Sequence, residues 1–167
     1  MIFPIKNIFI SCSLFFAFSL QANAQTRFPE KCIGKWQGTM YIFHQGKIRD
    51  SVDVLLHIKP INDTAWTWKT EYLSARQPMI KDYVLRHVGG NKYVTDEGEG
   101  IELMNYQFDQ QLLSTFETEG ILLTANYRLQ NGSLYFEVTS GKKLQLGNNV
   151  TSYSIDNLQQ VMLHRIP

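Results

Sequence analysis

Short runs in which hydrophobic and polar side chains alternate make up most of this sequence from Gly34 onward. In the clearest run, every second residue from Val52 to Ile58 is apolar, while Asp53 and His57 take the other face. This alternation is typical of half-buried β-strands. Turn residues such as Asn131-Gly132 separate the runs. The pattern predicts strands over residues 35–44, 51–59, 65–72, 80–88, 92–96, 101–108, 112–118, 121–129, 133–139, 150–154 and 159–166.

The number and spacing of these runs predict an all-β fold. Strands joined by short turns close most simply into an antiparallel up-and-down barrel of about 8–10 strands, which removes exposed sheet edges. A two-sheet sandwich is the alternative. Residues 158–162 fit a helical turn as well as a strand, and the polar, glycine-bearing residues 140–149 predict a long loop. The pattern leaves open which face of residues 80–88 and 101–108 points inward.

The first 24 residues read as a signal peptide. Lys6 precedes the 13-residue apolar run Ile8–Leu20, and Ala22-Asn23-Ala24 forms a small-x-small cleavage pattern. The run is shorter than the roughly 20 residues that span a bilayer. We therefore expect cleavage near Ala24-Gln25, a secreted or periplasmic protein, and one barrel domain over residues 25–167 without a transmembrane segment.

Charge and cysteine content exclude several classes of function. Without residues 1–24 the chain has 15 basic and 15 acidic side chains and no basic cluster, so we expect no nucleic-acid partner. Cys32 is then the one remaining cysteine, which excludes an intrachain disulfide. The sequence has no Gly-x-Ser-x-Gly, His-Glu-x-x-His or P-loop pattern, and we assign no catalytic residue and no cofactor. A monomer is expected.

Gly34-Lys35-Trp36-Gln37-Gly38 resembles the Gly-x-Trp start of the first strand in the calycin superfamily. This group includes lipocalins, fatty-acid-binding proteins and ten-stranded, haem-binding nitrobindin-like barrels. The resemblance implies that Trp36 covers the closed end of the barrel and stacks against an arginine of a late strand, with Arg165 as first candidate and Arg128 as second. In the nitrobindin-like barrels a proximal histidine lies near the C-terminal end, where this chain has His164.

Aromatic side chains on several predicted strands are the candidates for a ligand cavity. In a barrel of ten strands, such side chains either fill the lumen or form the wall of a cavity for one small molecule. Aromatic walls suit flat or acyl ligands, and phenol and indole groups add polar contacts. The candidates are Trp66, Trp68, Tyr72, Tyr83, Phe116, Tyr127 and Phe136.

Other polar groups favour structural roles. The four histidines show no metal-ligand spacing, so no metal site is predicted. The acidic residues 96–102 read as a charged hairpin turn, with calcium binding as the alternative. Asp82 and Arg86 share one face of a strand, either as an ion pair in the lumen or on the outer wall. Sequons occur at Asn62, Asn131 and Asn149.

Two functions from different classes follow from this interpretation. The first is an exported, lipocalin-like barrel that binds a small apolar or amphipathic molecule. The second is a filled barrel that acts as an interaction module of the cell envelope, without a small ligand, through its outer strand faces and residues 140–149.

Overall fold

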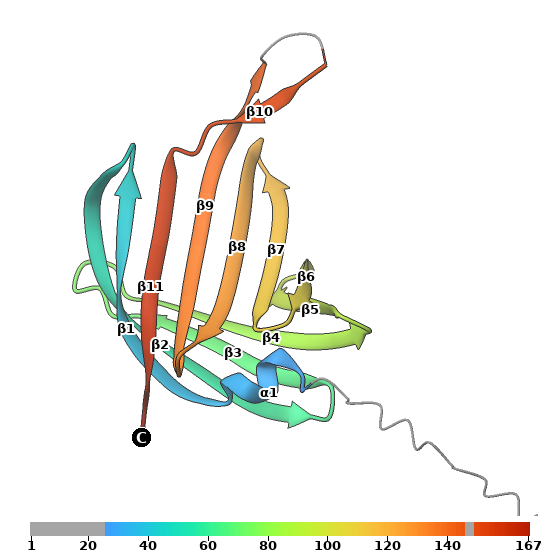
Figure 1. Cartoon of the computed structure of the whole chain (residues 1–167). Coiled ribbons are helices and arrows are strands. Elements are labelled where there is room, and N and C mark those ends of the chain that lie inside the picture. The colour runs from blue at the N-terminus through green and yellow to red at the C-terminus, as the bar shows by residue number, and fades with distance from the viewer. Residues whose placement is uncertain (1–25, 146–148) are drawn as a thin grey trace, which may run out of the picture.

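The computed structural model describes residues 26–145 and 149–167, so the predicted signal peptide lies outside the described residues. One short helix precedes eleven strands (Figure 1). The elements are α1 (Phe28–Cys32), β1 (Gly34–His44), β2 (Lys47–Asn62), β3 (Ala65–Tyr72), β4 (Met79–Gly89), β5 (Lys92–Gly98), β6 (Ile101–Phe108), β7 (Gln111–Thr118), β8 (Ile121–Gln130), β9 (Ser133–Gln145), β10 (Thr151–Tyr153) and β11 (Asn157–Ile166).

Ten of these strands form a closed antiparallel barrel. Strands β1 to β9 pair in chain order, β9 pairs with β11, and β11 returns to β1. The remaining strand, β10, pairs only with β9. This confirms the predicted all-β up-and-down barrel over the sandwich, and residues 158–162 belong to strand β11 rather than a helical turn.

Strand β9 corrects the prediction of a loop over residues 140–149. It continues to Gln145, where residues beyond Ser140 pair first with β8 and then with β10. Gly141 permits this change of partner, because a side chain there would overlap the backbone of Ser154. Local polarity predicted a loop, but hydrogen bonds from two neighbouring strands keep the segment extended.

The helix α1 was not predicted from the sequence. Pro29 lies in its first turn, and the Glu30 carboxylate accepts a hydrogen bond from the Arg27 backbone N–H at 3.2 Å. A proline followed by an acidic residue is a recognised helix start, although five residues are too few to show a helical period. In Figure 1, α1 lies at the end of the barrel where β2 turns into β3.

The hydrophobic core occupies the end of the barrel that α1 covers. Phe28, Trp36, Ile58 and Leu134 are almost fully buried there. At the opposite end, the β9–β10 pair extends beyond the barrel (Figure 1). No helix within residues 26–145 and 149–167 has the length and apolarity needed to cross a membrane. The core therefore closes one end of the barrel and leaves the site at the other.

Candidate functional site

A cavity of about 470 Å³ lies inside the barrel, beyond the core. All ten strands of the barrel contribute inward-facing residues to its wall. The contribution of β11 is Gln159. Its opening includes Ser74 and Gln77 from the β3–β4 connection. The apolar part of the wall consists of Met40, Ile42, Val52, Trp68, Met79, Leu103, Phe116, Leu123, Ala125, Phe136 and Val138.

Three aromatic rings that contact one another form part of this wall. The Trp68 and Tyr127 rings meet edge to face at 5.2 Å between centroids, and Tyr127 stacks on Phe136 at 4.1 Å. Burial raises the pKa of Tyr127, so its hydroxyl stays protonated at neutral pH. The Tyr127 and Phe136 rings therefore form an uncharged stacked pair in the wall, and Trp68 lies edge-on to it.

The structure brings six of the seven aromatic candidates together around the cavity, namely Trp68, Tyr72, Tyr83, Phe116, Tyr127 and Phe136. Trp66 is the exception. It does not line the cavity and packs against Tyr93 at 6.4 Å between ring centroids. Trp66 and Trp68 share the inward face of β3, but Trp66 lies nearer the closed end, so it belongs to the core.

A polar group lies closer to the mouth. Lys81 Nζ donates a hydrogen bond to the Tyr83 hydroxyl at 2.8 Å, and Tyr72 and Glu97 also line this part of the cavity. Burial alone lowers the pKa of Lys81, but the hydrogen bond to Tyr83 and the nearby Glu97 charge raise it overall. Burial raises the pKa values of Tyr72 and Tyr83. At neutral pH this group therefore offers an ammonium ion and two neutral hydroxyls.

A second polar group lies deeper and was missed by sequence reasoning. Asn105 and Ser114 line the cavity at 6% and 4% exposure, beside Thr95. Strand β6 turns Leu103, Asn105 and Gln107 inward and leaves Met104, Tyr106 and Phe108 exposed. The sequence left this orientation open, and the structure places the larger apolar side chains of β6 on the outer face. The one feature of the sequence that could have indicated this group is the pair of amide side chains, Asn105 and Gln107, on the same face of β6.

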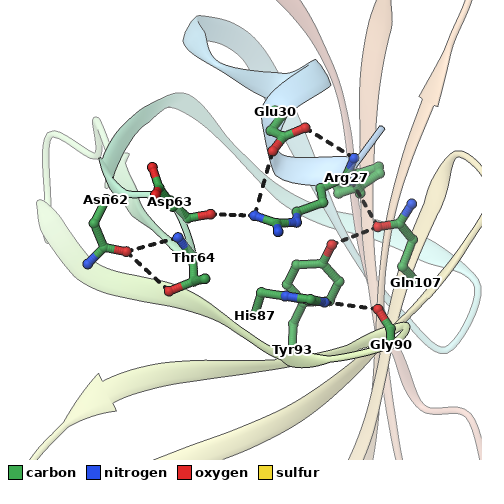
Figure 2. A network of polar contacts seen from close by, with 10 residues as sticks. Arg27, Glu30, Asn62, Asp63, Thr64, His87, Gly90, Tyr93 and Gln107 are labelled. Carbon is green, nitrogen blue, oxygen red and sulfur yellow. Dashed lines mark hydrogen bonds and ion pairs between the residues drawn. The ribbon is translucent and has the colours of Figure 1, made fainter. Parts of the chain in front are cut away.

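Gln107 explains why β6 has this orientation. Figure 2 shows its side chain between α1 and Tyr93. Its Oε1 accepts hydrogen bonds from the Phe28 backbone N–H at 2.9 Å and the Tyr93 hydroxyl at 2.8 Å. Its amide nitrogen donates to the Asp109 carbonyl oxygen at 3.3 Å. Turning β6 over would leave these buried groups unpaired, which costs about 1–3 kcal/mol for each group.

Arg165, rather than Arg128, lies over Trp36 at the closed end. The guanidinium carbon is 4.4 Å from the centre of the indole ring, and Nη2 donates to the Lys31 carbonyl oxygen at 3.2 Å. Gly34, at φ 137°, has no side chain to obstruct the guanidinium. The Trp36 indole N–H donates to the Cys32 carbonyl oxygen at 2.8 Å. Arg128 instead lies over Tyr135.

Other candidate groups lie outside the lumen. Arg86 forms ion pairs with Glu102 and, at 3.9 Å, with Asp96. Since Lys81 and Tyr83 face the cavity, Asp82 and Arg86 alternate onto the outer wall, so the reading of a lumen ion pair is wrong. His164 is exposed beside Ser133, at 3.3 Å between Nδ1 and Oγ, and does not face the lumen as a proximal ligand would.

Comparisons with known proteins support the fold. No protein-family model and no curated sequence matches this chain. The S-type phycobiliprotein lyase CPES from Guillardia theta is similar in structure, with a TM-score of 0.61, 10% identity and coverage of 84% of this chain and 91% of the lyase. Rv2717c from M. tuberculosis has a TM-score of 0.53 and 12% identity over 82% of this chain and 94% of that protein.

A third similar structure is a DUF3598-family protein of unknown function from Nostoc punctiforme, with a TM-score of 0.56 and 12% identity. The match covers 82% of this chain but only 48% of that longer protein. At identities this low, the likenesses show the fold alone. The closed barrel of ten antiparallel strands is calycin-like, as the Gly-x-Trp resemblance implied.

Proposed function

We propose that this protein is an exported, lipocalin-like barrel that binds a small apolar or amphipathic molecule in its lumen. The observation that carries this proposal is the cavity of about 470 Å³, which is walled by aromatic rings and lies beyond a complete core. Burial of ligand surface contributes roughly 25 cal/mol per Å² before ordering costs are subtracted. An aromatic wall with a few polar groups is typical of small-molecule sites.

Export is part of the proposal and rests on the sequence. Lys6, the apolar run Ile8–Leu20 and the pattern at Ala22–Ala24 support a cleaved signal peptide. The protein would then meet its ligand outside the cytoplasm, in the periplasm or the surrounding medium. N-terminal sequencing of protein from the host's extracellular fractions tests this, with Gln25 expected as the first residue. An intact Met1 would contradict export by cleavage.

The first test of ligand binding is a comparison of native and denatured masses. Protein purified from its native compartment is measured by mass spectrometry under both conditions, with an absorption spectrum alongside. We expect an additional mass that disappears on denaturation, because burial of apolar ligand surface against the aromatic wall favours an occupant. Equal masses, together with no binding of a panel of amphipathic fluorophores, would contradict the proposal.

Variants of the cavity wall locate the binding site. We expect Trp68→Ala and Tyr83→Ala to weaken fluorophore binding at least tenfold, because each removes aromatic surface from the wall. Ala125→Trp fills the cavity without removing a core contact, so it should abolish binding even if Trp68→Ala lowers stability. Thr124→Trp, on the outer face of the same strand, is the matched control. Unchanged affinity in Ala125→Trp would place the site elsewhere.

A further inference from the structure

Asn105 has an unusual position for an amide side chain. It is 6% exposed, lies on the inward face of β6 and lines the cavity between Thr95 and Ser114. Its Nδ2 donates to Thr95 Oγ1 and to the Leu103 carbonyl oxygen, at 2.9 Å in each case. Both amide hydrogens are therefore used within the protein.

The Leu103 contact fixes the orientation of the amide. A carbonyl oxygen only accepts, so the atom of Asn105 that faces Leu103 must be the nitrogen. The amide oxygen is then the group left for the lumen. Among residues 26–145 and 149–167 no hydrogen bond to this oxygen is formed. Ser114 does not supply one, since its hydroxyl donates to the Met104 carbonyl oxygen at 2.7 Å.

This acceptor lies inside a wall in which apolar side chains predominate. Asn105 as a residue is 6% exposed, but its Oδ1 is not among the fully buried side-chain atoms that lack a partner, so the oxygen keeps contact with the lumen and can accept from a ligand donor that reaches it. Asn105 lies deeper than Lys81 and Glu97, which lie toward the mouth. A ligand that enters far enough to contact the stacked rings therefore comes within the part of the lumen that this oxygen faces.

Resting on the proposed function, we infer that the ligand is a planar, largely apolar molecule with an N–H or O–H donor on its ring system, which hydrogen-bonds to Asn105 Oδ1. The stacked Tyr127 and Phe136 rings, with Trp68 edge-on to Tyr127, favour a flat body, and the Asn105 oxygen favours a donor at this depth of the lumen. A simple saturated acyl chain satisfies neither preference.

Two pairs of probes test this inference by fluorescence titration of the mature chain. Carbazole and 9-methylcarbazole differ in the N–H group, and 2-naphthol and 2-methoxynaphthalene differ in the O–H group. We expect at least one donor probe to bind about tenfold more tightly than its methylated partner, because methylation leaves the Asn105 oxygen unpaired. The pair with the larger ratio distinguishes a nitrogen donor from a hydroxyl donor.

Variants at Asn105 show whether this side chain sets the preference. Asn105→Leu should bring the ratio within each pair close to one, and Asn105→Asp, which keeps an acceptor oxygen, should preserve a preference for the donor probe. Asn126→Leu on the outer wall of β8 is the matched control and should leave the ratio unchanged. The ratio in the unmodified chain needs no variant, so it stays informative if Asn105→Leu fails to fold.

The outcomes separate this inference from the proposed function. If both members of each pair bind with equal affinity in the unmodified chain, the inference is overturned while cavity binding stands, and water satisfies the Asn105 oxygen. If none of the four probes binds and Ala125→Trp changes no fluorophore titration, the proposed function fails as well. A preference that survives in Asn105→Leu would also overturn the assignment to this residue.

Discussion

At the scale of single residues, Arg165 combines three stabilising contacts at the closed end. Its guanidinium covers the Trp36 ring and donates to the carbonyl oxygens of Lys31 and Ile33. Those carbonyl oxygens lie at the C-terminal end of α1, where no backbone N–H of the helix is available to donate to them. Arg165 therefore joins the last strand of the barrel to the short segment that covers its core.

We expect Arg165→Leu to lower the free energy of unfolding by about 2–3 kcal/mol. The variant loses a cation–π contact worth about 1 kcal/mol and hydrogen bonds to two carbonyl oxygens. Urea unfolding monitored by tryptophan fluorescence measures the loss. Arg128→Leu is the control: it removes a cation–π contact with Tyr135 on the outer wall and should cost less than 1 kcal/mol. Equal losses would show that Arg165 is an ordinary surface residue.

At the scale of elements, β1 depends on a close approach by β11. Gly38 lies between Trp36 and Met40, both almost fully buried, and a side chain at Gly38 would overlap the carbonyl oxygen of Met162. The two strands therefore meet more closely here than a residue with a Cβ allows. The second glycine of the Gly-x-Trp-x-Gly segment thus has a packing role in closing the barrel.

Gly38→Ala should consequently destabilise the fold by about 1–3 kcal/mol, the usual cost of inserting atoms into a packed site. The backbone of β11 must move to admit the new methyl group. The preceding residue provides the control, because Gln37 is exposed, and Gln37→Ala should change stability by less than about 0.5 kcal/mol. Thermal unfolding of both variants measures the difference, and a Gly38→Ala variant as stable as the parent would contradict a tight β1–β11 contact.

At the scale of the whole molecule, several ionisable groups are held in their neutral forms inside the barrel. Burial raises the pKa of Cys32 from 9.0 to about 12 and that of Tyr93 from 10.0 to about 12. Burial also raises the pKa values of Tyr72, Tyr83 and Tyr127. In the unfolded chain these groups lose their protons at lower pH than in the folded chain.

The sign of the pH dependence follows from this difference. Above pH 9 the unfolded state binds fewer protons than the folded state, so the free energy of unfolding falls as the pH rises toward 12. We expect urea midpoints to decline steadily from pH 9 to pH 11 and to decline less in Cys32→Ala, which removes one of the titrating groups. The packing lost with the thiol lowers the urea midpoint of Cys32→Ala equally at every pH. Comparing the slopes of midpoint against pH in the two proteins therefore removes this constant difference. A flat profile would show that these groups are solvated in the folded barrel.

The sequence alone determined the strands and the fold class. Each strand needs only local alternation, as at Val52–Ile58, and each turn needs only residues such as Asn131-Gly132. Ten such strands have few ways to bury their apolar faces without exposed edges, so the barrel followed from local pattern and strand count. The Gly-x-Trp resemblance also pointed to the pair Trp36 and Arg165, which contact each other in the structure. Export remains a prediction, because residues 1–24 lie outside the described part of the chain.

Tertiary structure decided where along the lumen each inward side chain lies. Trp66 and Trp68 are indistinguishable by pattern and both belong to the core cluster, but Trp68 also borders the cavity and Trp66 does not. The pattern of β6 left its inward face open, and the structure turns Asn105 and Gln107 inward, where Gln107 accepts hydrogen bonds from groups on α1 and β5. Local alternation defines two faces of a strand, and contacts between distant segments choose which face is buried. The cavity and its unpaired acceptor depend on that choice.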